Sequence, residues 1–104
     1  MDQQNKKPAM HQRIFKMAFS METVSIYLLC CNLVDTEQTL SSANIRAIWN
    51  GTENILMAGI EELLKRNILS TVLSDRQGNT IYRLVDAEKW HVNEKVNPSE
   101  GNDK

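Results

Sequence analysis

The stretch Ile60-Glu-Glu-Leu-Leu-Lys-Arg-Asn-Ile-Leu69 predicts the end of one helix and the start of a β-strand. Its apolar residues continue a helical stripe that begins at Leu56. Lys65 and Arg66 place positive charge at the end of this helix, where the helix dipole favours it. Asn67 follows, and asparagine tolerates the left-handed backbone that terminates many helices. We therefore expect the helix to stop here and the chain to continue as a strand.

The residues after this junction predict a β-hairpin and a short terminal helix. Residues 68–73 (ILSTVL) and 80–85 (TIYRLV) are rich in the branched side chains typical of strands. The polar residues 74–79 between them include Gly78, which allows the chain to reverse. Asp86 is predicted to begin a short helix that carries Trp90, and residues 94–104 have the composition of a disordered tail.

A helix-turn-helix is predicted on the other side of the junction. Thr52 is suited to cap the helix that ends at Arg66. Asn50-Gly51 predicts the turn before it, because both residues tolerate a positive φ. Ser41 or Ser42 is predicted to cap the preceding helix, after a minimal strand at residues 39–40. That helix has three residues that we expect to face inward: Ile45, Ile48 and Trp49.

The first half of the chain predicts one long apolar helix behind a short basic segment. Ser20 is a good N-cap, and the helix that follows it runs to about Leu33 with apolar residues nearly all round. Such a helix is buried on more than one side, here by the N-terminal segment or by a partner subunit. Residues 10–19 fit a short helix or a docking strand, and we favour the helix. Residues 1–8 predict a flexible basic arm, so the folded domain spans residues 9–93.

This order of elements resembles the winged helix-turn-helix superfamily. Residues 60–69 resemble the passage "L-x-x-L-x-x-x-G-(hydrophobic)-I" that leads from the recognition helix into the wing, with Asn67 where glycine is usual. Residues 19–29 (FSMETVSIYLL) resemble the first helix of winged domains in phage and plasmid replication initiators and in DnaD-like proteins. The resemblance covers residues 19–85. It implies an α+β fold that is mostly α: a three-helix core and a two-stranded β-wing, with extra helical segments at both ends.

The resemblance also implies a partner, double-stranded DNA, which the third helix and the wing would contact. The charges modify this expectation, because 12 Lys and Arg residues face 13 Asp and Glu residues, for a net charge of −1. Such a chain does not coat nucleic acid by bulk charge. The positions expected to face the groove also lack Lys and Arg: Thr52, Glu53, Asn54, Met57, Ala58 and Glu61. The two carboxylates among them would be repelled by phosphates.

The basic residues gather instead in the N-terminal arm and around the wing. Residues 1–20 carry four cations and one acid, a net charge of +3. We therefore predict sequence-specific DNA binding as a dimer, led by the wing and the arm, in a transcriptional regulator or in an accessory factor for plasmid or phage replication, transfer or partition. The predicted DNA contacts are Lys6, Lys7, Arg13, Lys16, Ser42, Arg46, Thr52, Asn54, Arg76, Gln77, Asn79 and Arg83.

Each of these signals has an ordinary structural interpretation that the residues fit equally well. The wing tip fits a hydrophilic turn, the arm a solubilising tail, and the polar third helix a solvated surface. The residues predicted for the dimer surface fit a monomer core too: Phe15, Phe19, Ile26, Tyr27 and Trp90. The alternative function is a winged helix that docks on a protein partner in a nucleoprotein complex through its acidic third helix.

Catalysis is the third class of function, and the sequence does not favour it. His11 and His91 have no nucleophile pattern nearby, and the adjacent Cys30 and Cys31 lack a basic neighbour that would lower their pKa. Two thiols alone make no zinc site. We expect no enzyme activity, cofactor or metal. No apolar run is long enough for a membrane helix and residues 1–7 lack a secretory signal, so we expect a cytoplasmic protein.

Overall fold

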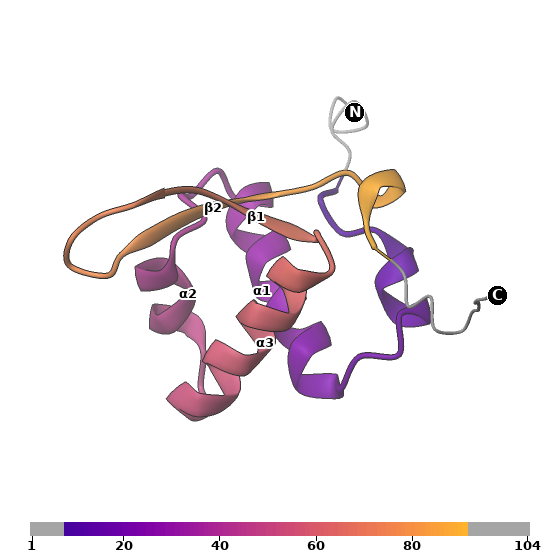
Figure 1. Ribbon diagram of the computed structural model, residues 1–104, viewed down its shortest axis with the longest axis horizontal. Helices are drawn as coiled ribbons and strands as arrows, with labels where there is room; N and C mark the ends of the chain where they lie inside the picture. The colour runs from indigo at the N-terminus through magenta and orange to yellow at the C-terminus, as the bar shows by residue number, and fades with distance from the viewer. Residues whose placement is uncertain (1–7, 92–104) are drawn as a thin grey trace, which may run out of the picture.

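The computed structural model describes residues 8–91, and the two ends of the chain lie outside the described residues. Those ends hold most of the predicted arm, including Lys6 and Lys7, and the whole of the predicted tail. The described elements are, in order, η2 (Gln12–Lys16), α1 (Met21–Asp35), α2 (Ser42–Ile48), α3 (Glu53–Lys65), β1 (Leu69–Ser74), β2 (Thr80–Leu84) and η3 (Ala87–Lys89). Three α-helices and a two-stranded antiparallel hairpin confirm the predicted α+β, mostly α, winged-helix-like arrangement (Figure 1).

Side-chain caps begin all three α-helices where the sequence predicts them. The hydroxyl of Ser20 accepts a hydrogen bond from the Thr23 amide at 3.2 Å, and that of Ser41 accepts one from the Asn44 amide at 3.1 Å. Thr52 caps α3 in the same way. Each cap supplies an acceptor to an amide that has no partner inside the helix, which fixes where the helix begins.

The predicted left-handed residue ends α3. Asn67 has a φ of 61°, and the amides of Asn67 and Ile68 donate to the carbonyls of Leu64 and Leu63 at 3.1 and 2.9 Å. These two bonds form a Schellman motif, which satisfies the last carbonyls of the helix and turns the chain toward β1. The junction around residue 67 therefore behaves as predicted, although asparagine replaces the usual glycine.

The turn between α2 and α3 forms where predicted but for a different reason. Neither Asn50 nor Gly51 has a positive φ. A side chain on Gly51 would instead place its Cβ only 2.6 Å from Cζ2 of the Trp49 ring. The Trp49 indole folds back over the turn and donates to the Thr52 carbonyl at 2.9 Å. Glycine is required here because an aromatic ring occupies the space of its missing side chain.

In the two-stranded hairpin, β1 has a free edge, whereas the other edge of β2 meets the chain just before α2. Leu69 pairs with Leu84 and Ser74 with Thr80, with a bulge between Thr71 and Leu73. On the other side of β2, Ser41 forms an isolated bridge with Ile81, and the Tyr82 amide donates to the Leu40 carbonyl. The minimal strand predicted at residues 39–40 is thus centred one residue later.

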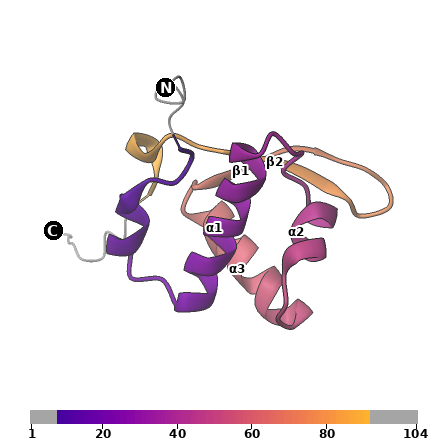
Figure 2. The same cartoon turned by 180° about the vertical axis from the view of Figure 1, so that it is seen from behind.

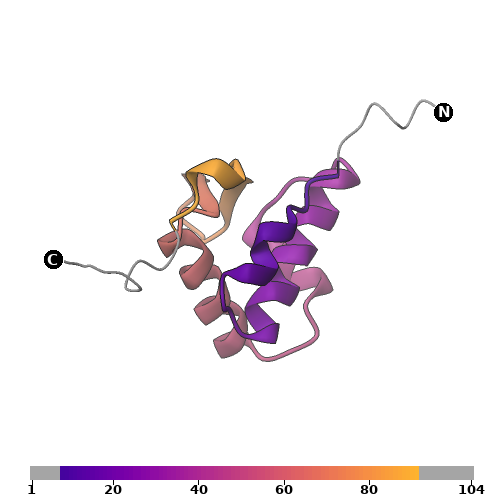
Figure 3. The same cartoon turned by 90° about the vertical axis from the view of Figure 1, so that its right-hand side faces the viewer.

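The core lies between α1, α3 and the base of the hairpin. In the side view of Figure 3, α3 and the hairpin lie on one side of the molecule, and α1 and the N-terminal segment lie on the other. Two predicted core positions of α2 differ from expectation, because Ile48 is exposed and Trp49 is only half-buried. The seven-residue helix is too short to bury more than the side around Ile45.

The extra segments at the two ends form helices of the 3-10 type and pack on each other. The predicted helix over residues 10–19 shrinks to the five residues of η2, because Ala18 adopts a φ of 62° soon after it. The side chain of Trp90 follows η3 and is buried, with its Nε1 donating to the Val85 carbonyl at 2.8 Å. Seen from behind in Figure 2, both segments lie at the end of the molecule opposite the tip of the hairpin.

Candidate nucleic-acid interface

The wing tip is a tight turn that an aspartate holds together. Oδ1 of Asp75 accepts hydrogen bonds from the amides of Gln77 and Asn79, both at 2.9 Å. The Gly78 amide donates to the Asp75 carbonyl at 3.2 Å, and Gly78 has a φ of 87°, which glycine adopts without strain. Arg76 and Gln77 lie between these anchors with exposed side chains. The turn therefore presents an arginine on a backbone that has little freedom left.

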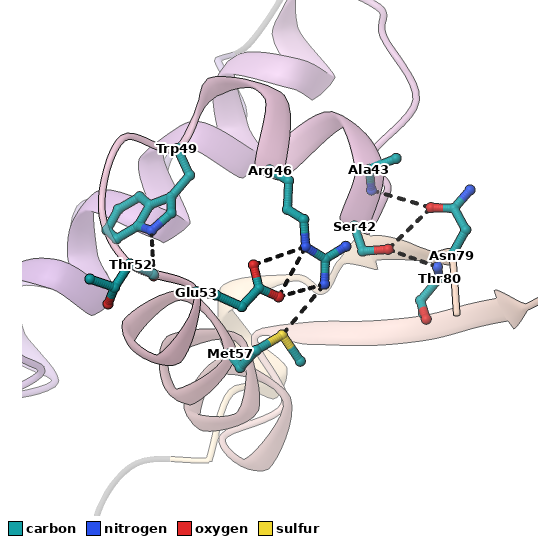
Figure 4. Close-up of polar contacts among 9 residues, drawn as sticks. All are labelled: Ser42, Ala43, Arg46, Trp49, Thr52, Glu53, Met57, Asn79 and Thr80. Carbon is teal, nitrogen blue, oxygen red and sulfur yellow. Dashed lines mark hydrogen bonds and ion pairs between the residues drawn. The ribbon is translucent and has the colours of Figure 1, made fainter. Parts of the chain in front are cut away.

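The base of the wing tip is fastened to the N-terminus of α2 (Figure 4). Oδ1 of Asn79 accepts from the hydroxyl of Ser42 at 3.1 Å and from the amide of Ala43 at 3.2 Å. The Thr80 amide donates to the same Ser42 hydroxyl at 2.9 Å. Ser42 is buried, and the side chains of Ser42 and Asn79 join the wing to α2, so their predicted contact with DNA stays a prediction. Open amides at the start of a helix need acceptors, and Asn79 supplies one.

Arg46 and Glu53 form an ion pair across the turn between α2 and α3 (Figure 4). Nε of Arg46 donates to both carboxylate oxygens of Glu53 at 3.1 and 3.0 Å, and Nη2 donates to Oε2 at 2.8 Å. The hydrogen bond from Arg46 lowers the pKa of the Glu53 carboxyl, and the same contact raises the pKa of Arg46. Sequence reasoning named both residues separately and missed that they pair, since it had no measure of how closely the turn brings them together.

The outward face of α3 is polar, and the Glu61 carboxylate on it makes no ion pair within residues 8–91. Asn54, Met57, Ala58 and Glu61 are exposed, as predicted. Thr52 is exposed too, but its hydroxyl is already used to cap the helix. With Glu53 neutralised by Arg46, this face is less negative than the sequence suggests.

The predicted cations differ in whether they have a partner. Within residues 8–91, the side chains of Arg76, Arg83 and Lys16 make no hydrogen bond or ion pair. Arg83 lies on β2 opposite Ser70, with its side chain exposed. Arg13, by contrast, donates from Nη1 to the Ala87 carbonyl at 2.8 Å, so it holds the C-terminal segment and does not offer a free cation. This bond gives Arg13 a structural role, and its contact with DNA stays a prediction.

Most of the predicted dimer surface belongs to the interior of the monomer. Ile26, Tyr27 and Trp90 are buried at 0%, 1% and 6% exposure, so these three cannot form a contact between subunits. Phe19 is half-buried and carries the Arg66 guanidinium 5.0 Å above its ring. Phe15 alone of the five is well exposed, at 59%. The periodicity of these residues could not distinguish a core from an interface, because both are apolar.

The described residues hold few other groups with reactive chemistry. Burial raises the pKa of the Cys30 thiol to about 12 and that of Cys31 to about 11. Both thiols are free and buried, as expected of core residues. In residues 8–91 no three side chains of His, Cys, Asp or Glu gather where they could hold a metal ion. The same residues contain no helix with the length and apolar character needed to cross a membrane.

The comparisons with known proteins leave the geometry as the guide to function. No family model, curated protein or solved structure matches this chain. The wing tip, the outward face of α3 and the Arg46–Glu53 pair are therefore weighed by their own chemistry.

Proposed function

We propose that this protein binds double-stranded DNA, with the wing as its leading contact. The observation that carries the proposal is Arg76, an exposed arginine that makes no hydrogen bond or ion pair within residues 8–91, on a turn that Asp75 and Gly78 hold in one shape. Because the backbone of this turn is already held, little backbone freedom is lost when the guanidinium meets a phosphate or a narrow minor groove. Arg83, exposed on β2 opposite Ser70, is a second cation on the hairpin.

The third helix would add polar contacts to those of the wing. Asn54 is exposed near the N-terminus of α3, where recognition helices contact base edges, and asparagine pairs with adenine there. Glu61 opposes phosphate contact from the same face. We therefore expect modest affinity for a single copy and retain the proposal that two copies act together, with Phe15 as the remaining candidate of the predicted dimer surface.

The wider biological proposal follows the resemblance noted in the sequence. A winged domain of this kind suits a transcriptional regulator or an accessory factor in replication, transfer or partition. The N-terminal arm with Lys6 and Lys7 lies outside the described residues, and its contribution to DNA binding is part of the proposal.

The test is a titration of fluorescent duplexes drawn from the DNA that flanks the gene, at two salt concentrations. Replacing Arg76 by Ala should weaken binding and reduce the slope of log affinity against log salt by about 0.9, the value for one lost phosphate contact. The matched control is Lys89→Ala, which removes one exposed cation from η3, at the end of the molecule opposite the wing tip (Figure 2). Equal binding by both variants and the wild type would refute a wing-led interface.

One observation favours a second candidate, docking of α3 on a protein. Met57 and Ile55 on α3 are 45% and 40% exposed, and Glu61 and Glu62 lie on the following turn. An apolar contact bordered by acids suits a basic partner. Salt separates the two functions, because binding through several cations falls steeply with added salt and a mainly apolar contact does not.

A further inference from the structure

We infer that Glu53 restrains Arg46 and thereby limits the affinity of this domain for DNA of arbitrary sequence. This inference rests on the proposed function, since it concerns the same interface. It makes Glu53 a positioning and specificity-determining residue, whose effect on DNA passes through the arginine that it holds.

The geometry of the pair defines where the guanidinium is held. Three hydrogen bonds fix Arg46 against the carboxylate, and Nη2 also contacts Sδ of Met57 at 3.8 Å. The side chains of Arg46 and Glu53 remain 42% and 55% exposed. An ion pair so open to water adds little to the stability of a fold. The position of the ion pair points to a role in binding, because the pair lies at the first turn of α3, beside the residues best placed to contact DNA.

The pair removes a cation from a region that has few. Arg46 is the only Lys or Arg among the seven residues of α2, and α3 has none before Lys65 in its last turn. Sequence-independent DNA affinity comes from cations that displace counterions from phosphates. While Glu53 holds Arg46, the helix-turn-helix offers no free cation near the start of α3.

The same pair can open at a suitable base. A glutamate carboxylate accepts a hydrogen bond from the N4 amino group of cytosine in the major groove. Once Glu53 takes that bond, Arg46 is free to turn to a neighbouring phosphate. Opening then accompanies binding to sites that present cytosine at this position, and other sequences leave the pair closed. Glu53 would thus lower non-specific binding more than specific binding.

The experiment compares the preferred duplex from the gene's flanking DNA with a duplex of scrambled sequence. We expect Glu53→Gln to tighten binding to the scrambled duplex about three- to tenfold and to steepen its salt slope by about 0.9, as for one added phosphate contact. The ratio of the two affinities should fall. The double variant Arg46→Ala/Glu53→Gln should lose the gain, because no cation remains to be released.

The matched control is Glu61→Gln, which removes the same charge from the same helix. Glu61 is exposed and makes no ion pair within residues 8–91, so its replacement relieves repulsion without releasing a cation. An unchanged salt slope in Glu53→Gln, an equal gain in Glu61→Gln, or a gain that survives in the double variant would each overturn the inference. If Arg76→Ala still weakens binding in that case, the proposed function stands alone. If the wild type binds neither duplex, both fall.

Discussion

At the end of the molecule that contains Trp90, arginines donate hydrogen bonds to the main chain, whereas the arginines of the hairpin make none within the residues that the structure describes. Arg13 donates to the Ala87 carbonyl, and Arg66 donates to that of His91 and lies over the Phe19 ring. Arg76 and Arg83 make no such bonds within the described residues. The sequence gives the same residue type at both ends, so the surroundings decide which cations are structural and which are free to meet a ligand.

Among the variants that test this comparison, we expect replacement of Trp90 to have the largest effect, a loss of stability. Its ring packs edge-on against Tyr27, with 5.7 Å between the centroids, and its indole nitrogen donates to Val85. Replacement by Ala should lower the free energy of unfolding by about 3–5 kcal/mol, the usual range for a buried aromatic residue. Urea unfolding followed by circular dichroism measures this. A loss below about 1 kcal/mol would mean that the terminal segments are not part of the folded core.

A smaller loss of stability is expected at Arg13. Its guanidinium donates to the Ala87 carbonyl and so joins η2 to the segment that carries Trp90. A hydrogen bond from a charged donor stabilises a fold more than one from a neutral donor. Arg13→Ala should therefore cost about 1–2 kcal/mol of unfolding free energy, with DNA affinity unchanged. Lys16→Ala is the control on the same segment, since Lys16 is exposed and makes no hydrogen bond or ion pair within residues 8–91. Equal unfolding midpoints for the two variants would contradict the role of Arg13.

Breaking the hydrogen bonds that join the wing to α2 should affect both the stability of the fold and its affinity for DNA. Asn79→Ala removes the acceptor of Ser42 and Ala43, which should cost about 1 kcal/mol of stability. It should also weaken DNA binding, because the turn that carries Arg76 would lose one of its supports. Gln12→Ala is the control, since its side chain is exposed, makes no hydrogen bond in residues 8–91 and is not among the predicted DNA contacts. A variant at Asn79 with normal DNA affinity would show that the fastening does not position the tip.

The comparison between the Trp90 end and the hairpin also shows which features of the structure the sequence could predict. Caps at Ser20 and Thr52 and the left-handed Asn67 are local features, because each depends on hydrogen bonds within a few residues, and all three are confirmed. The partners of Arg13, Arg46 and Asn79 lie 74, 7 and 37 residues away along the chain. Only the folded chain brings such groups together. That is why the elements were predictable and the division between structural and free polar groups was not.

The smallest effect on stability is expected where the cations are free. Arg76→Ala and Arg83→Ala remove exposed side chains that make no hydrogen bond or ion pair in the described chain, so each should change the unfolding free energy by less than about 0.5 kcal/mol. Unchanged stability is informative only together with the DNA titration. A residue that serves ligand binding should change the affinity for the ligand and leave the stability of the fold unchanged. Arg13→Ala should show the opposite pattern. Were Arg76→Ala to destabilise the protein as much as Arg13→Ala does, the arginine at the wing tip would be structural, and the distinction between the two ends would be lost.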